Sequence, residues 1–178
     1  SESINAKLGL DYYASKKTTF GVVFNGFNNP GTFSNRSDVL ISDPNRVLNS
    51  ITRAGTTNER TWKNFGTNLN FRHVFDSTGK EITADVDYLT YKSTNTQDLV
   101  NSYYSPTGIP TFTPDTLLGS LPQDINIYTA KIDYVHPLKK GAKIEAGIKT
   151  GLVKTDNDAV YDSLLNNKRI LDRGRSNH

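Results

Sequence analysis

The chain has 178 residues, of which 35% are hydrophobic and 22% charged, with a net charge of +3. Basic and acidic residues are interspersed, which argues against nucleic-acid binding, and the absence of cysteine excludes disulfides and thiolate metal sites. No run of about 18 apolar residues is present, so no transmembrane helix is predicted, whereas the strands of a membrane barrel need be only half apolar.

Apolar and polar residues alternate most clearly between residues 125 and 155, in two segments joined by a short corner. In the second segment Ile144 and Ile148 share one face, whereas Glu145 and Lys149 point to the opposite face. A period of two predicts β-strands. Strands of more than about ten residues are long for a soluble sheet and suit a tilted crossing of a membrane.

The same alternation predicts six strands in chain order, at about residues 4–14, 18–28, 62–75, 80–92, 125–137 and 142–155. The stretches between them are rich in Asn, Ser, Thr, Pro and Gly. Residues 29–61 and 93–124 are therefore expected to be long loops, with a small hairpin or strand extensions as an alternative within the first. Residues 156–178 are expected to form a C-terminal loop.

The connection lengths predict the topology. Short turns follow the first, third and fifth expected strands and long connections follow the others, so an antiparallel meander would place every short turn at one end. Outer-membrane barrels have this asymmetry, whereas sandwiches mix loop lengths at both ends. The predicted fold is an all-β, antiparallel up-and-down meander that forms a single segment, residues 1–178, of a transmembrane barrel. Six strands are too few to close one, so the chain is expected to be a piece of a larger barrel.

Three phrases resemble the barrel repeats of the Bacteroidetes-type outer-membrane β-barrel family, which is related to TonB-dependent receptors: LGLDYYASKKTTFG, WKNFGTNLNFRHVFDSTGKEITADVDY and TAKIDYVHPLKKGAKIEAGIKTGLVKTDND. The resemblance implies a full-length protein with an N-terminal sandwich domain, a plug and a large barrel. It also implies an outer-membrane location, ligand capture and uptake, and TonB-type energy coupling. The chain alone is not expected to transport a ligand.

Charged side chains on the polar faces of the strands are expected to line a hydrated lumen and to pair across strands. The lumen-facing candidates are Lys7, Asp11, Arg72, Asp85, Asp87, Lys131, Asp133, Lys143, Glu145 and Lys149. Paired carboxylates can perform acid–base catalysis, but the chain has neither a G-x-S-x-G motif nor a P-loop, so no catalytic residue, enzyme activity or cofactor is predicted. The histidines lack metal-ligand spacing, so no metal site is predicted, and His73 and His136 are expected at a membrane interface.

Aromatic residues suggest two further roles. Tyr103, Tyr104 and Phe112, within the second long connection, are candidates for stacking on a sugar or another ligand, with packing onto the neighbouring segment as the alternative. Two further groups are expected to form girdles at the membrane interfaces. The short-turn group is Tyr12, Tyr13, Phe20, Phe75 and Tyr134, and the long-loop group is Trp62, Phe65, Tyr88, Tyr91 and Tyr128.

The expected partners are outer-membrane lipid and an unknown small-molecule or glycan ligand, with no nucleic acid. The alternative function is a soluble β-sandwich module for carbohydrate binding or adhesion that uses the same three loop aromatics. An isolated barrel piece exposes an apolar face and raw sheet edges, so self-association is expected. Val86, Ile132, Ile144 and Ile148 are expected to be covered by a sandwich-like closure, by other copies of the chain, or by detergent.

Overall fold

The computed structural model describes residues 2–165 and 168–177. These residues form a single antiparallel sheet, and a short 3₁₀ turn at Lys139–Gly141 is the one helical element among them. The sheet contains β1 (Ile4–Ser15), β2 (Thr18–Ser42), β3 (Leu48–Val74), β4 (Glu81–Tyr104), β5 (Pro110–Ser120), β6 (Gln123–Pro137), β7 (Lys143–Asn157), β8 (Val160–Leu165) and β9 (Lys168–Leu171). The predicted all-β antiparallel meander is confirmed. None of the described helical residues forms a segment long and apolar enough to span a membrane.

Two of the long strands of the sheet are each interrupted once, so each of them appears as two of the nine strands. β4 pairs with β6 along one half and with β5 along the other, in one continuous register. The interruption between β5 and β6 falls at Leu121 and Pro122, where proline has no N–H to donate to the ladder. β7 and β8 likewise share a register, with a break at Asp158 and Ala159. Each pair of strands is therefore one long strand with a local interruption, and β9 adds a short edge.

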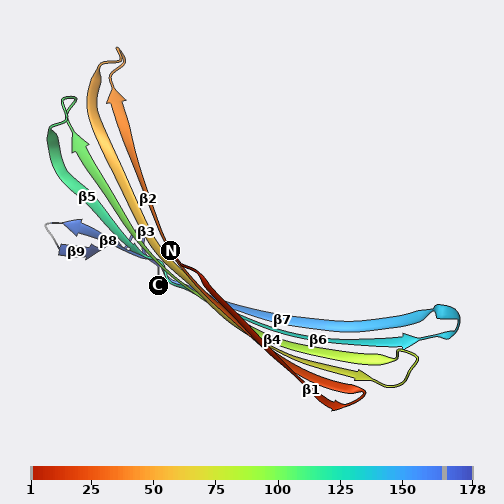
Figure 1. The fold of residues 1–178 in the computed structure, drawn as a ribbon. Helices are drawn as coiled ribbons and strands as arrows, with labels where there is room; N and C mark the ends of the chain where they lie inside the picture. The colour runs from red at the N-terminus through yellow and green to blue at the C-terminus, as the bar shows by residue number, and fades with distance from the viewer. Residues whose placement is uncertain (1, 166–167, 178) are drawn as a thin grey trace.

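The short turns gather at one end of the sheet, as predicted, and the β2–β3 and β4–β5 hairpins extend from the other (Figure 1). In the β3–β4 turn Gly79 has a φ of 93°, which glycine adopts without strain. The Asp76 carboxylate in this turn accepts hydrogen bonds from the backbone N–H and the hydroxyl of Thr78. Those two bonds hold the pKa of Asp76 below its ordinary value.

The prediction of long loops is wrong for most of residues 29–61 and 93–124, because these residues continue the strands, whereas the alternative of strand extensions within the first stretch is confirmed. β2 and β3 are 25 and 27 residues long and are joined by a tight turn closed by the Val47 N–H to the Asp43 carboxylate. The residues expected as a loop at 93–124 extend β4 and form β5, and the expected C-terminal loop contains β8 and β9. Alternation is weak here because polar residues occupy both faces. Pro30 is tolerated because β2 is an edge strand beyond Asn28, the last β2 residue that pairs with β1.

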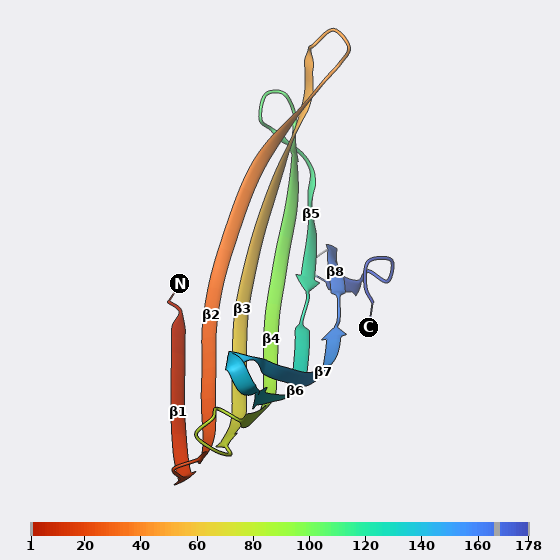
Figure 2. The same cartoon turned by 90° about the vertical axis from the view of Figure 1, so that its right-hand side faces the viewer.

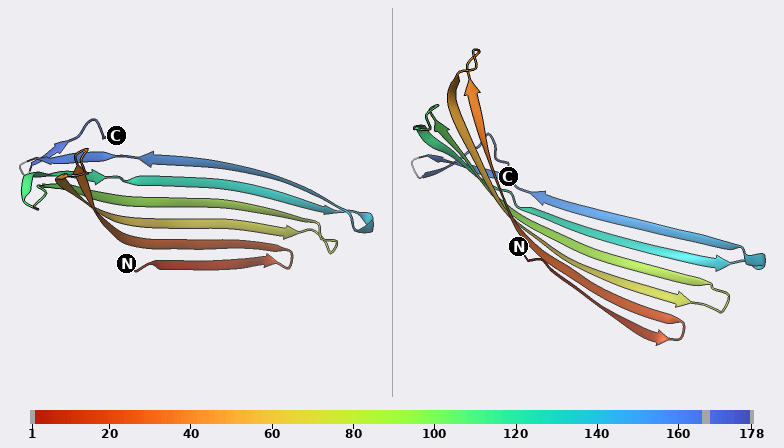
Figure 3. Two further views of the ribbon diagram at one scale, coloured as in Figure 1. Left: turned by 90° about the horizontal axis from the view of Figure 1, so that it is seen from above. Right: turned by 45° about the horizontal axis from the view of Figure 1, so that its top comes forward.

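The sheet bends near its middle into two halves (Figure 1). We call residues 4–28, 62–93 and 123–157 the wall, and residues 29–61, 94–122, 158–165 and 168–177 the extension. β2, β3 and β4 run through both halves, whereas β1 flanks the wall alone (Figure 2). Two further views show the same single row of strands (Figure 3).

The sheet is one layer thick, and no hydrophobic side chain among the described residues is buried. Val86, Ile132, Ile144 and Ile148 are 52%, 47%, 54% and 71% exposed. The expected sandwich-like closure of the single chain is therefore wrong, since strands of this length form one open sheet with no second layer to pack against. The two-layer sandwich alternative does not fit this architecture.

Candidate functional site on the polar face

The strand register sorts the side chains of the wall onto two faces, because residues directly opposite one another share a face. One row across six strands is Tyr12, Phe20, Phe71, Ala84, Ile132 and Ile148. The adjacent row on the other face is Asp11, Gly21, Asn70, Asp85, Lys131 and Lys149. We call these the apolar face and the polar face.

The register places all of the charged lumen-facing candidates on the polar face. It brings some of them together as ion pairs. The Lys131 ammonium lies 2.5 Å from Asp133, and the Lys143 ammonium lies 2.6 Å from Glu145. Both of these pairs join residues two apart on one strand, whereas the ion pair between Arg72 and Glu81 joins β3 and β4 as expected.

Cross-strand contacts on the polar face centre on Asp87 and Arg72. The Asp87 carboxylate accepts hydrogen bonds from the Asn68 amide and the Thr129 hydroxyl, each at 2.7 Å. Arg72 donates to Glu81 of β4 at 2.7 Å. These contacts make a hydrated surface of fixed charges and amides.

Glycines on the polar face leave room for these side chains. A Cβ on Gly21 would lie 2.5 Å from the Asn70 Oδ1 and 2.6 Å from the Asp11 Oδ1. A Cβ on Gly147 would collide with the Asp133 carboxylate that pairs with Lys131. The long polar side chains therefore lie across the glycines, close to the sheet.

Aromatic residues mark both ends of the apolar face. At the short-turn end Tyr134 packs edge-on against Phe75, and its hydroxyl lies 3.1 Å from the His136 Nδ1. At the other end of the wall Tyr88 and Tyr128 pack at 5.0 Å between ring centroids. The register also puts Tyr12, Phe20 and Phe65 on this face. Tyr13, Trp62 and Tyr91 lie on the polar face instead, so their expected place in the girdles is wrong.

An apolar face bounded by aromatic rings and backed by a charged face is the arrangement of a barrel wall in a membrane. The family model described as "Outer membrane protein beta-barrel family" matches residues 73–178, more than half of the chain. The chain belongs to the outer membrane protein beta-barrel family. A search of curated proteins finds no match to it. Its location is the outer membrane.

The three aromatic ligand candidates of this outer membrane barrel protein lie in the extension, on strands or at strand ends. Tyr103 and Phe112 face each other on the polar side, edge to face, with 6.1 Å between ring centroids. Tyr104 points to the opposite side, where the Arg53 guanidinium lies 5.2 Å from its ring centroid. The structure thus brings Tyr103 and Phe112 together and separates Tyr104 from them.

The barrel protein also has a hollow on the polar face at the bend, which the sequence analysis did not find. Two adjoining depressions of about 450 Å³ and 350 Å³ share Arg60 and Asn95. The smaller one is also lined by Trp62, Ser93, the two strand interruptions and Asn177. These residues were assigned to loops or to a girdle. Counting the period of two backwards from Trp62 would have placed Arg60 on the same face.

Proposed function

We propose that the chain forms part of the wall of an outer-membrane receptor that captures a small molecule or glycan outside the cell and passes it inward. In the full-length protein a plug and TonB-type energy coupling would drive that passage. The chain itself performs no catalysis in this proposal. It contributes a surface for binding and passage.

One observation carries the proposal. The side of the sheet that carries the polar face of the wall continues into the extension, since β2, β3 and β4 run unbroken through the bend. In a barrel the opposite, apolar face meets lipid, so the polar face turns towards the lumen. A ligand caught on this side of the extension would then meet Asn58, Arg60 and Asn95 at the bend before it reaches the charges and amides of the wall.

The orientation of the two faces can be tested by cysteine labelling, because the chain has no cysteine of its own. Ala84 and Asp85 are neighbours on β4 that lie on opposite faces. In cells expressing the full-length protein, we expect Asp85→Cys to react with a charged, water-soluble maleimide. Ala84→Cys should react only after the membrane is dissolved in detergent. Equal labelling of the two variants would contradict the proposal.

The uptake role is tested by comparing cells with and without the gene. Depletion of solutes from a defined medium is followed by mass spectrometry in the deletion strain, the complemented strain and the parent. We expect at least one solute to be depleted more slowly without the gene, to recover on complementation, and to respond to a proton-gradient uncoupler. Identical depletion profiles in all three strains would overturn the receptor role and leave the labelling result intact.

A further inference from the structure

We propose that the smaller depression at the bend is a binding site for a neutral sugar, an inference that rests on the proposed receptor function and names its ligand class. We call it the bend site. Its lining residues are Arg60, Trp62, Ser93, Asn95, Leu121, Pro122, Gln123, Asn157, Asp158, Ala159 and Asn177.

The bend site lies where a ligand on the extension would enter the wall. It is built from β3, β4 and the two interruptions, between β5 and β6 and between β7 and β8. The interruptions bring Leu121 and Pro122 beside Asp158 and Ala159, and the Asp158 N–H still donates to the Pro122 carbonyl oxygen at 3.3 Å. Its volume of about 350 Å³ matches a small-molecule pocket.

The apolar part of the bend site includes the planar indole ring of Trp62. Trp62 is the single tryptophan of the chain, and the Arg60 guanidinium lies 5.7 Å from its ring centroid. Leu121 and Pro122 add apolar surface beside it. A pyranose ring has C–H groups on its faces and hydroxyls around its edge, so it suits a flat apolar wall with polar groups at the rim.

The polar part consists mainly of groups that both donate and accept hydrogen bonds. Asn95, Gln123 and Asn157 supply amides, and Ser93, which is 5% exposed, supplies a hydroxyl. A sugar hydroxyl also donates and accepts, and so can satisfy either kind of partner. The site has one guanidinium and one carboxylate, from Arg60 and Asp158, which favours a ligand without net charge.

The buried carbonyl oxygen of Asn95 selects between ligand classes. Among the described residues this Oδ1 has no hydrogen-bond partner, although Asn95 lines both depressions. An unpaired buried acceptor is unfavourable, and a rotation about χ2, which is soft in an amide, would turn it towards a ligand. An ionised carboxylate cannot donate to it, whereas a hydroxyl can.

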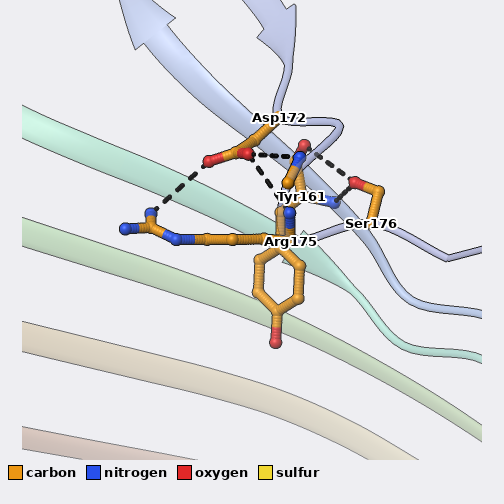
Figure 4. A network of polar contacts seen from close by, with 5 residues as sticks. Tyr161, Asp172, Arg175 and Ser176 are labelled. Atoms are coloured by element: carbon orange, nitrogen blue, oxygen red, sulfur yellow. Dashed lines mark hydrogen bonds and ion pairs between the residues drawn. The ribbon is translucent and has the colours of Figure 1, made fainter.

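A folded-back C-terminal segment holds the rim of the site in place. Ala159 and Asn177 exchange two backbone hydrogen bonds, at 2.8 and 3.0 Å. The Asp172 carboxylate accepts hydrogen bonds from backbone N–H groups of the turn that follows it, and the Tyr161 N–H donates to the Ser176 hydroxyl at 2.9 Å (Figure 4). These contacts fix Asn177 beside the depression before any ligand binds, which lowers the entropy cost of binding.

The fluorescence of Trp62, the chain's single tryptophan, reports directly on the bend site. The full chain, held in detergent micelles with its β-structure checked by circular dichroism, is titrated with maltose, cellobiose, lactose and N-acetylglucosamine. Acetate and succinate, which have ionised carboxylates and no hydroxyl, serve as charged comparators. We expect a saturable fluorescence change with at least one neutral sugar and none with the charged probes.

Two variants locate the binding. Asn95→Ala should weaken the binding of the neutral sugar about tenfold or more, since it removes the unpaired acceptor. Asn101→Ala is the matched control, because Asn101 lies farther along β4 on the same face and outside both depressions. The affinity of Asn101→Ala for the neutral sugar should equal that of the unchanged chain. The same comparison, made with radiolabelled sugars on the full-length protein in outer-membrane vesicles, does not depend on refolding of the chain.

Three results would overturn the inference: no neutral sugar binds, a charged probe binds more tightly, or Asn95→Ala and Asn101→Ala behave alike. A non-sugar solute whose uptake needs the gene but is unaffected by Asn95→Ala would also overturn the sugar site while leaving the receptor function standing. If the gene affects no solute at all, the receptor function fails, even where the sugar titration succeeds.

Discussion

Asp38 and Arg53 form the best-aligned ion pair of the extension. They lie directly opposite each other on β2 and β3, with the Arg53 Nε 2.9 Å from Oδ1 and Nη2 3.0 Å from Oδ2. The same guanidinium lies over the Tyr104 ring. A bidentate ion pair of this kind fixes the register of the β2–β3 hairpin, although both groups are exposed and their attraction is screened by salt.

This pair predicts a pH response of the β2–β3 hairpin. The hydrogen bonds from Arg53, with smaller contributions from its charge and that of Arg36, lower the pKa of Asp38 below its ordinary value of 3.8. A lowered carboxylate pKa stabilises the hairpin above about pH 4, and that stabilisation is lost as the pH falls through the folded-state value. The protection of backbone amides near the hairpin end, measured relative to their slower intrinsic exchange in acid, should therefore fall below about pH 4.

A titration of the Asp38 carboxyl by NMR checks this prediction. The midpoint should lie below 3.8 in the unchanged chain and move up towards 3.8 in Arg53→Gln. Asp38→Asn should remove the acid-dependent loss of protection near the hairpin end. If the Asp38 midpoint is the same with and without Arg53, the ion pair does not hold the hairpin in solution.

At the scale of one strand, two glycines of β7 show how closely the side chains of the polar face pack against the backbone. Gly147 and Gly151 lie on the same face of this strand, but they have different surroundings. A Cβ on Gly147 would collide with Asp133, whereas a Cβ on Gly151 would make ordinary contacts at 3.6 Å. Gly147→Ala should therefore displace Asp133 from Lys131.

We expect Gly147→Ala to lower the free energy of unfolding by about 1 kcal/mol, because the neighbouring side chain must move. Gly151→Ala should be neutral or stabilise by up to about 1 kcal/mol, since alanine restricts the unfolded chain. Urea unfolding of both variants in detergent, followed by circular dichroism, measures the difference. Equal effects would show that Asp133 moves aside without cost.

Strand positions could be predicted wherever one face was apolar and the other polar. Ile144 and Lys149, or Phe71 and Asn70, alternate because one face meets lipid. The six long strands of the wall, and the end of the sheet at which the short turns lie, could therefore be predicted. The extension has no such contrast: Arg60 and Glu59 are both charged, yet they occupy opposite faces of β3. Period-two reasoning gives no signal there, and the strands were assigned to loops.

The candidate site was predictable in part for the same physical reason. The ten charged candidates for a lumen lie on the face that alternation assigns to them. The bend site was not predictable, because it depends on contacts that register creates between distant segments. Arg60 is opposite Asn95, and Asn177 reaches the hollow by pairing with Ala159. No local pattern in the sequence records either pairing.

At the scale of the whole molecule, the chain is an open sheet with an apolar face and an unpaired edge along β1. Leu8, Leu10 and Tyr12 of that edge strand are 71%, 70% and 66% exposed. Exposed apolar surface and free N–H and C=O groups both promote association in water. In detergent the apolar face is covered, so only the edges remain available.

We therefore expect the isolated chain to sediment as oligomers in water and mainly as monomers in detergent micelles. Analytical ultracentrifugation over a range of concentrations measures both states. Replacing Ile132 and Ile148 together by lysine should reduce association in water, because it places charge at the centre of the apolar face. Lys149→Ala, on the polar face beside Ile148, is the control and should leave association unchanged. A monomer in water, or equal association of the two variants, would mean that the apolar face does not drive assembly, and would contradict the assignment of that face to lipid.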